Sequence, residues 1–159
     1  MRELGPSRVI DALADWGAHE ASGRLRNQVQ PLPAGDVAEA ADLTLRYRAP
    51  FVAHILSHYP AGAIMVDLEP QDADRLVLAD GRSLEQWIAQ ATGDSLAHFE
   101  QLRDAAGSPQ GPVVAAVLQP GLSPIVVVDG WHRSAAWFER CRTRRPSNLS
   151  AHLLIWTKP

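Results

Sequence analysis

The residues best suited to chemistry stand in the stretch IVVVDGWHRSAAWFE, from Ile125 to Glu139, where an apolar run becomes polar. The β-branched run predicts a buried strand, Asp129-Gly130 predicts a turn, and the residues that follow predict a helix. His132 and Arg133 therefore fall in the first helical turn, whose free N–H groups carry partial positive charge and favour acids and hydroxyls. Two cationic-leaning side chains are out of place there unless an anion binds among them.

The same stretch supplies the parts of an anion-binding pocket. Gly130 lets the backbone approach a ligand closely, and the N–H groups of Trp131, His132 and Arg133 line the first turn of the helix. Arg133 forks two phosphate or carboxylate oxygens, while His132 donates to a third oxygen or moves a proton near neutral pH. The residues alone leave one alternative open, in which Arg133 pairs with Asp129 and His132 caps a carbonyl.

A second group of candidates is acidic. Asp67, Glu69 and Asp72 stand at the end of a strand that the alternating pattern of GAIMVDLEP predicts over residues 62–70. Carboxylates are the ligands that Mg²⁺ prefers, so Asp72 and Glu69 are candidate metal ligands beside a triphosphate. The alternative for Glu69 is a surface acid next to a proline turn.

Two further groups are candidates for contact with phosphates. In TGDS, Ser95 and nearby backbone N–H groups present a second helix start to a phosphate, with a plain N-cap as the alternative. An arginine cluster follows the central motif and is either a nucleic-acid contact or a solvated helix end, because cations suit helix C-termini. Its members are Arg140, Arg142, Arg144 and Arg145.

The composition is that of one globular domain with a full-sized core: 159 residues, 46% hydrophobic and 21% charged. With 15 Lys and Arg against 18 Asp and Glu, the net charge is −3, which excludes a domain-wide basic surface for nucleic acid. The single cysteine, Cys141, excludes an internal disulfide and fits a reducing compartment. No apolar stretch is long enough to span a bilayer, so we expect a cytoplasmic protein without a membrane partner.

Residues 1–60 are expected to form an α-helical N-terminal extension. A helix is predicted from after Ser7 to about Glu20, and a second is predicted to follow Asp36, which with Glu39 resembles a capping box. A third is predicted over PFVAHILSH, which begins at Pro50.

Residues 61–159 alternate between strand and helix patterns. Besides the strand of residues 62–70, strands are predicted over 112–120, 124–130 and 150–156, and the second of these is apolar on both faces and therefore central. Helices are predicted after Ser83, after TGDS and over residues 131–142, whereas residues 75–83 fit either a short hairpin or a helix end. The fold class is α/β (α+β), a small mixed sheet flanked by helices, and the two parts are expected to make one compact unit.

A strand, then Asp-Gly-x-His-Arg, then a helix beginning with small residues resembles the signature of the ParB/sulfiredoxin superfamily, in which this turn holds nucleotide phosphates. The resemblance is concentrated in residues 124–139, has looser support from the order of elements between Gly62 and Trp156, and does not cover residues 1–60. It implies a ParB/sulfiredoxin-like domain over residues 61–159 that binds ATP or ADP, with Mg²⁺, at Asp129 to Arg133.

The departures from this signature narrow the expected chemistry. Sulfiredoxins carry a nucleophilic cysteine where this chain has Trp131, and Cys141 lies ten residues further on, about 15 Å along a helix. Sulfiredoxin activity is therefore disfavoured. Chromosome-partitioning ParB proteins add a helix-turn-helix and a dimerisation region, for which no residues follow Pro159, so a partition role is disfavoured too.

Two groups of relatives remain. In small-molecule kinases of this fold, such as free serine kinases, a general base sits in a Leu-x-Pro-x-acid context; LEPQD resembles it and puts Asp72 in that place, with Glu69 nearby. Compact plasmid fertility-inhibition proteins of the oncogenic-suppression type are linked to ATP hydrolysis, to DNA cleavage and to blocking DNA export in conjugation.

The leading hypothesis is an ATP-binding protein of ParB/sulfiredoxin fold that transfers or hydrolyses a phosphoryl group, and an ATPase or DNase acting in the inhibition of plasmid conjugation is the particular form that the resemblance favours. Its expected partners are a nucleotide and either DNA or a DNA-transfer protein. Its expected catalytic residues are Asp72, Glu69, His132 and Arg133. The alternatives are a kinase for a small, amino-acid-like molecule that uses Asp72 as base, and a non-catalytic inhibitor or partner-binding module.

Overall fold

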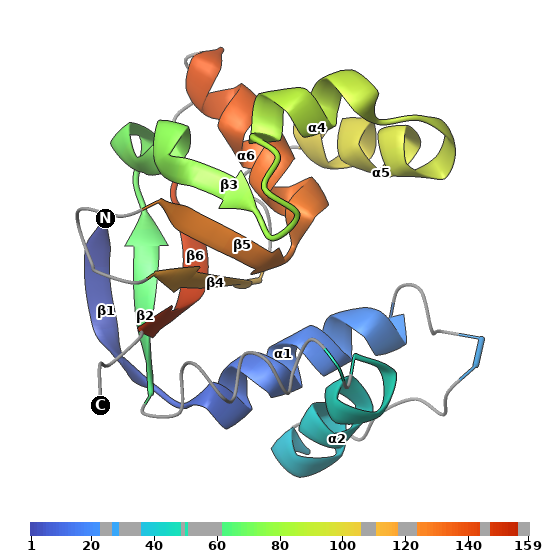
Figure 1. Cartoon of the computed structure of the whole chain (residues 1–159), viewed down its shortest axis with the longest axis vertical. Coiled ribbons are helices and arrows are strands. Elements are labelled where there is room, and N and C mark those ends of the chain that lie inside the picture. Colours follow the sequence, from blue (N-terminus) through green and yellow to red (C-terminus); the bar gives the residue numbers. More distant parts are fainter. Residues whose placement is uncertain are drawn as a thin grey trace.

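The computed structural model describes residues 1–22, 27–28, 36–48, 50, 62–105, 111–117, 124–143 and 147–155. These residues contain a six-stranded mixed sheet in the order β1-β2-β6-β4-β5-β3 (Figure 1). The pairs β4/β6 and β3/β5 are parallel, and the other neighbours are antiparallel. The strands are β1 (Arg2–Ser7), β2 (Ala63–Leu68), β3 (Leu76–Leu78), β4 (Val113–Val117), β5 (Ile125–Asp129) and β6 (Leu149–Ile155).

Helices cover both faces of this sheet (Figure 1). On one face lie α1 (Val9–Ser22) and α2 (Val37–Tyr47); on the other lie the 3₁₀ helix η1 (Pro70–Arg75), α4 (Leu84–Gln90), α5 (Gly93–Asp104) and α6 (Trp131–Arg142). Alternate residues of β4 show the division, because Val113 and Ala115 pack with the core under α6 whereas Val114 and Ala116 pack with the core under α1. The mixed α/β class predicted from the sequence is confirmed.

The expectation that residues 1–60 are purely helical is wrong at its start. Residues Arg2–Ser7 form the edge strand β1, which pairs antiparallel with β2 so that Arg2 lies opposite Asp67 and Ser7 opposite Ala63. The segment RELGPS has no alternating apolar pattern and contains a proline, which is tolerated on an edge strand. Its strand conformation comes from the free edge of β2, a long-range partner that the local pattern does not reveal.

The predicted starts of the next two helices are confirmed. Helix α1 runs over Val9–Ser22, and Asp36 caps α2 by accepting a hydrogen bond from the Glu39 N–H at 2.9 Å. The third predicted helix falls almost entirely on residues 51–61, outside the described residues. Within the described part of the chain, no helix is long and apolar enough to cross a membrane.

Helices α1 and α2 pack in close contact. A Cβ on Gly17 would lie 1.8 Å from the Ala40 carbonyl oxygen, so only glycine fits where the two helices touch. The Thr44 hydroxyl, fully buried, donates to the Leu13 carbonyl at 2.8 Å. These contacts hold the helix pair together, and α1 in turn packs on β4.

The later elements agree closely with the sequence pattern. Strand β5 lies between β4 and β3, and α6 spans the predicted residues 131–142. Residues 75–83 contain the end of η1, the strand β3 and a tight turn that folds back on it, because the Leu78 N–H donates to the Arg82 carbonyl at 2.8 Å and Val77 makes an antiparallel bridge to Ser83. This is close to the short-hairpin alternative. Ser83 and Gln86 form the predicted capping box of α4.

Candidate functional site

The turn between β5 and α6 is built around Gly130. This residue is the N-cap of α6 with φ 86°, in the left-handed region, and a Cβ there would lie 2.6 Å from Val113 Cγ1. The first intrahelical bond runs from the Ser134 N–H to the Gly130 carbonyl, and no side chain caps the helix. Among the described residues, no acceptor is found for the backbone N–H groups of Trp131 and His132, so these donors are open to a ligand.

A second helix start meets the first. The Ser95 hydroxyl lies 2.8 Å from His132 Nε2, and Ser95 is in the first turn of α5, which packs beside α6 (Figure 1). Helix α5 has Thr92 at its N-cap but likewise lacks a side-chain cap. Because each helix start carries partial positive charge, their convergence creates a region that favours an anion. We call this region, formed by Ser95 and residues 129–133, the anion site. The sequence had identified Ser95 and His132 separately, and the fold brings them together.

His132 is electrically neutral in this site. Its ring makes edge-on contacts with Trp87, at a centroid distance of 5.1 Å, and with His98, at 4.8 Å. Burial, and then the neighbouring His98, lower the pKa of His132 to about 4. This lowered pKa favours a neutral ring that acts as a hydrogen-bonding group at neutral pH, while proton transfer by His132 stays a prediction.

Arg133 is held by partners from several parts of the chain. Its guanidinium donates to the Pro112 carbonyl at 2.8 Å, lies 3.3 Å from Asp129 Oδ2, and contacts His19 on α1 at 3.0 Å. The side chain is only 11% exposed. The pairing of Arg133 with Asp129, which the sequence left as an alternative, is thus present. His19 was not identified from the sequence, because nothing in α1 indicates a partner 114 residues away.

The Asp129 carboxyl has an unusual pKa for an aspartate. Burial raises the pKa of Asp129 to about 6, although Arg133 and the Gly130 N–H act in the opposite direction. Burial and the Arg133 charge also lower the pKa of His19. The cluster therefore combines a permanent cation, a neutral imidazole and a carboxyl that exchanges its proton near pH 6.

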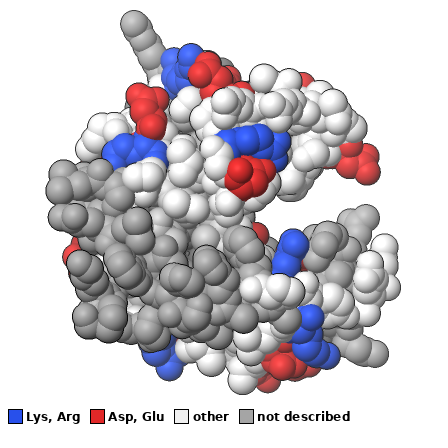
Figure 2. Space-filling view, in the orientation of Figure 1, with Lys and Arg blue, Asp and Glu red and all other residues white. Residues whose placement is uncertain are grey.

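The molecule is hollowed beside these residues. In the orientation shared by the two views, Figure 2 shows a deep notch between the part formed by α1 and α2 and the part formed by α4 and α5. The end of α1, which carries His19, and the start of α6 lie on the side where the notch opens (Figure 1).

The acidic candidates lie in a different cluster. Asp72, 3% exposed, lies 2.5 Å from the Met1 ammonium and 3.0 Å from Arg75, and it accepts the Glu69 N–H at 3.0 Å. Glu69 lies 2.6 Å from the same ammonium. Burial alone would raise the pKa of Asp72, but the ammonium, the Glu69 N–H and Arg75 together hold that pKa below its ordinary value.

This cluster is well separated from the turn, because β6 and β4 lie between β2 and β5. Three strand spacings correspond to about 14 Å. The carboxylates of Asp72 and Glu69 are already matched by cations, so they do not fit Mg²⁺, and the described residues contain no group of three metal-ligating side chains. Their roles as base and metal ligands stay predictions, without support from the packing.

The arginine cluster is dispersed. Arg140 is 9% exposed and donates to the Ala105 carbonyl at 3.0 Å, whereas Arg142 pairs with Glu85 at 2.8 Å on the surface. Arg144 and Arg145 lie outside the described residues. Burial of Arg140 removes it from any open nucleic-acid surface, so the described residues give little support to DNA contact here.

Trp131 and Cys141 are the two residues at which the sequence departs from the sulfiredoxin signature. Trp131 is half-buried at the mouth of the turn, with the Arg82 guanidinium carbon 5.9 Å from its ring centroid. Cys141 is half-buried, and burial raises the pKa of its thiol to about 11, so it is a poor nucleophile.

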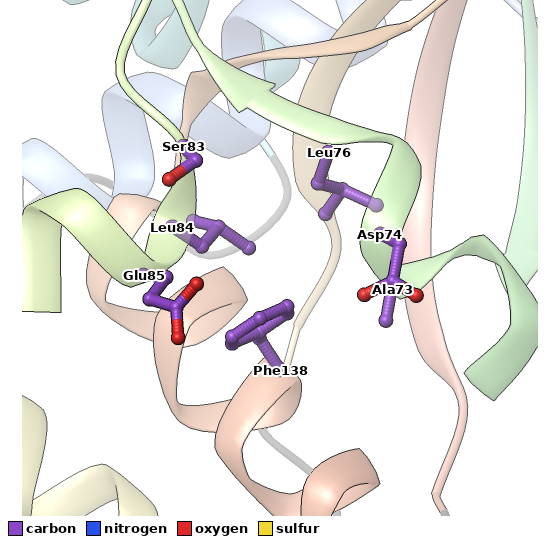
Figure 3. A pocket seen from close by; sticks show the side chains of 7 residues that line it. All are labelled: Ala73, Asp74, Leu76, Ser83, Leu84, Glu85 and Phe138. Atoms are coloured by element: carbon purple, nitrogen blue, oxygen red, sulfur yellow. The ribbon is translucent and has the colours of Figure 1, made fainter.

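A small pocket elsewhere is not a competing nucleotide site. It encloses about 140 Å³ between η1, β3, α4 and α6, with Glu85 and Asp74 on opposite sides of Phe138 (Figure 3). Pockets for drug-sized ligands enclose roughly 300–1,000 Å³. The lining residues are Ala73, Asp74, Leu76, Ser83, Leu84, Glu85 and Phe138, none of which belongs to the anion site.

No protein-family model, curated protein or solved structure matches this chain. The case for its function therefore rests on the chemistry of the site.

Proposed function

We propose that this protein binds the phosphate groups of a nucleotide such as ATP or ADP where the first turns of α5 and α6 meet, and that it hydrolyses or transfers a phosphoryl group there. The observation that carries the proposal is the 2.8 Å contact between Ser95 and His132, which joins two helix starts that lack side-chain caps. Two converging positive helix ends favour a multiply charged anion over a neutral ligand.

Arg133 supplies the charge that such a ligand needs. Its guanidinium lies beside the first turn of α6 and contacts the Asp129 carboxylate as well as the neutral acceptors Pro112 and His19, so a phosphate competes with that carboxylate for it. A bidentate arginine contact with phosphate is stronger than a bond to a carbonyl or imidazole, which favours the exchange of partners on binding.

Asp129 is the proton acceptor that we assign to the chemical step. A carboxyl with a pKa of about 6 is largely ionised at neutral pH yet basic enough to take a proton from an attacking water. Asp72, in contrast, is engaged by two cations, so the kinase alternative has less support. The strand, turn and helix around DGWHR support a ParB/sulfiredoxin-like fold as part of this proposal.

Isothermal titration of the native protein with ATP, ADP and pyrophosphate tests binding. Arg133→Ala should weaken binding by about 2 kcal/mol, or about 30-fold, because it removes a charge-assisted contact. Arg142→Ala is the matched control, since this arginine lies on the same helix but pairs with Glu85 on the surface. Absence of binding to the folded wild-type protein refutes the proposal.

Release of inorganic phosphate from ATP tests the catalytic part. Asp129→Asn should bind ATP at least as tightly as wild type, because it removes a carboxylate that competes for Arg133, yet it should hydrolyse ATP roughly 10²-fold more slowly. Equal hydrolysis by this variant excludes Asp129 as the base and leaves the binding proposal standing.

A further inference from the structure

A second constellation of polar residues lies on the α1 face of the sheet. His152 on β6 is 5% exposed and lies in register with Val114 of β4, whose side chain packs under α1. Its Nδ1 atom is 2.8 Å from the Ser7 hydroxyl, and its Nε2 atom is 2.6 Å from Asp15 Oδ2. Serine, histidine and aspartate thus form one hydrogen-bonded chain from three separate elements.

The chemistry of the three side chains determines which atom donates each hydrogen bond. An ionised carboxylate only accepts hydrogen bonds, so the contact with Asp15 requires the proton on His152 Nε2. The Nδ1 atom then carries a lone pair, and the Ser7 hydroxyl must be the donor. This is the arrangement of nucleophile, base and orienting acid that activates serine, with the roles of the two ring nitrogens exchanged.

The backbone around Ser7 suits a nucleophile. Ser7 is the last residue of β1 and stands two positions before α1, and its side chain is half-buried at the open edge of the sheet. Among the described residues, no acceptor is found for the N–H groups of Val9 and Ile10 in the first turn of α1. Free donors at a helix start next to a serine are able to stabilise an oxyanion.

We propose that Ser7 is an activated nucleophile and that Ser7, His152 and Asp15 form a second catalytic site, which hydrolyses small carboxylic esters. The Ser7 oxygen attacks the ester carbonyl while its proton passes to His152 Nδ1, and collapse of the adduct expels the alcohol, which takes that proton. Water then attacks the acyl-serine with His152 as base, releasing the acid and restoring Ser7. Ser7 and His152 are the catalytic residues, and Asp15 is a positioning residue.

The test uses the full chain, a fluorophosphonate probe and p-nitrophenyl acetate. The fluorophosphonate should form one adduct on Ser7, with fluoride expelled, as located by mass spectrometry. Ser7→Ala should lose this adduct and lower the rate of ester cleavage at least 10²-fold, while Ser22→Ala, which alters an exposed serine of α1, should leave both unchanged.

The role of Asp15 needs a readout that a purely structural contact would not change. Asp15 is 45% exposed, so Asp15→Asn should slow both reactions by roughly 10- to 100-fold, less than for a buried acid, and Asp15→Glu should restore part of the rate. The ¹⁵N shifts of His152 should report the Nε2–H tautomer in the wild type and its loss in Asp15→Asn.

Two results overturn the proposal. One is an unmodified Ser7 after exposure to fluorophosphonate under conditions that fully label a known serine hydrolase. The other is ester cleavage by a folded Ser7→Ala variant at the wild-type rate.

Discussion

His19 of α1 contacts Arg133 of α6 through both ring nitrogens, at 3.0 and 3.3 Å, and these residues are 114 positions apart in the chain. The guanidinium only donates hydrogen bonds and a neutral imidazole has a single acceptor nitrogen, so one of the two contacts is a hydrogen bond that His19 accepts and the other is a close approach. A neutral His19 is consistent with its lowered pKa. The contact makes the N-terminal helix part of the wall of the anion site.

A double-mutant cycle on this pair should reveal a coupling. His19→Ala leaves a buried guanidinium N–H without that acceptor, so the single variant should lose about 1–3 kcal/mol of unfolding free energy. The loss should be smaller when Arg133 is already alanine, giving a coupling of about 1 kcal/mol or more in urea unfolding. Additive effects of the two substitutions would show that the contact does not stabilise the native state.

Gly130→Ala should be among the most damaging substitutions of the turn. It places a Cβ in a left-handed residue and 2.6 Å from Val113 Cγ1, so the cost combines backbone strain with a steric clash. We expect a loss of about 2–4 kcal/mol in urea unfolding. Gly81→Ala is the matched control: Gly81 has φ +87° but no atom within 4 Å of the added Cβ, so its loss should be about 1 kcal/mol. Equal losses of unfolding free energy in Gly130→Ala and Gly81→Ala would mean that Val113 moves away from the added Cβ without a cost in stability.

At the turn between β5 and α6, the titration of Asp129 and that of His132 should change stability in opposite directions as the pH falls. The pKa of Asp129 is raised to about 6, so its contribution to stability is present at acid pH and lost as the pH rises towards 6. The pKa of His132 is lowered from 6.5 to about 4, so its contribution is present above 6.5 and lost as the pH falls towards 4. Between pH 4 and 6.5 the two trends offset each other.

A substitution that removes one of these titrating groups should therefore reveal the pH dependence of stability that the other contributes. From pH 6.5 to 4.5, Asp129→Asn should lose about 1–2 kcal/mol more than wild type, because it lacks the stability that protonation of Asp129 supplies over this interval. His132→Gln should instead gain stability over the same interval. Urea unfolding at several pH values measures both, and parallel profiles for the three proteins would contradict the assigned pKa shifts.

Asp72→Asn should lower stability rather than nucleotide affinity. The substitution removes the charge that faces the Met1 ammonium and Arg75 in a buried position, which should cost about 3 kcal/mol. Glu69→Gln, at a side chain that is 34% exposed, should cost less than 1 kcal/mol and serves as the control. If Asp72→Asn is fully folded, binds ATP normally and has lost phosphoryl transfer, the kinase alternative is correct and Asp129 is not the base.

The sequence was most informative where short-range rules apply. The β-branched run, the Asp-Gly turn and the helix of residues 131–142 depend on neighbours within a few positions, as do the caps at Asp36 and Ser83, and the structure contains all of them. The candidate status of Arg133 and Gly130 followed from the same local reasoning, since a helix start has a known polarity.

Only the tertiary structure decided which side chains meet. It brought together Ser95 and His132, which are 37 positions apart, His19 and Arg133, which are 114 apart, and Ser7 and His152, which are 145 apart. It also placed Asp72 against the Met1 ammonium, in a cluster separated from the β5–α6 turn by β6 and β4. It also made a strand of RELGPS, because the edge of β2 offered hydrogen bonds that no local pattern records. Periodicity and capping depend on residues that are close in the sequence, whereas strand order and the burial of polar partners depend on how distant elements pack.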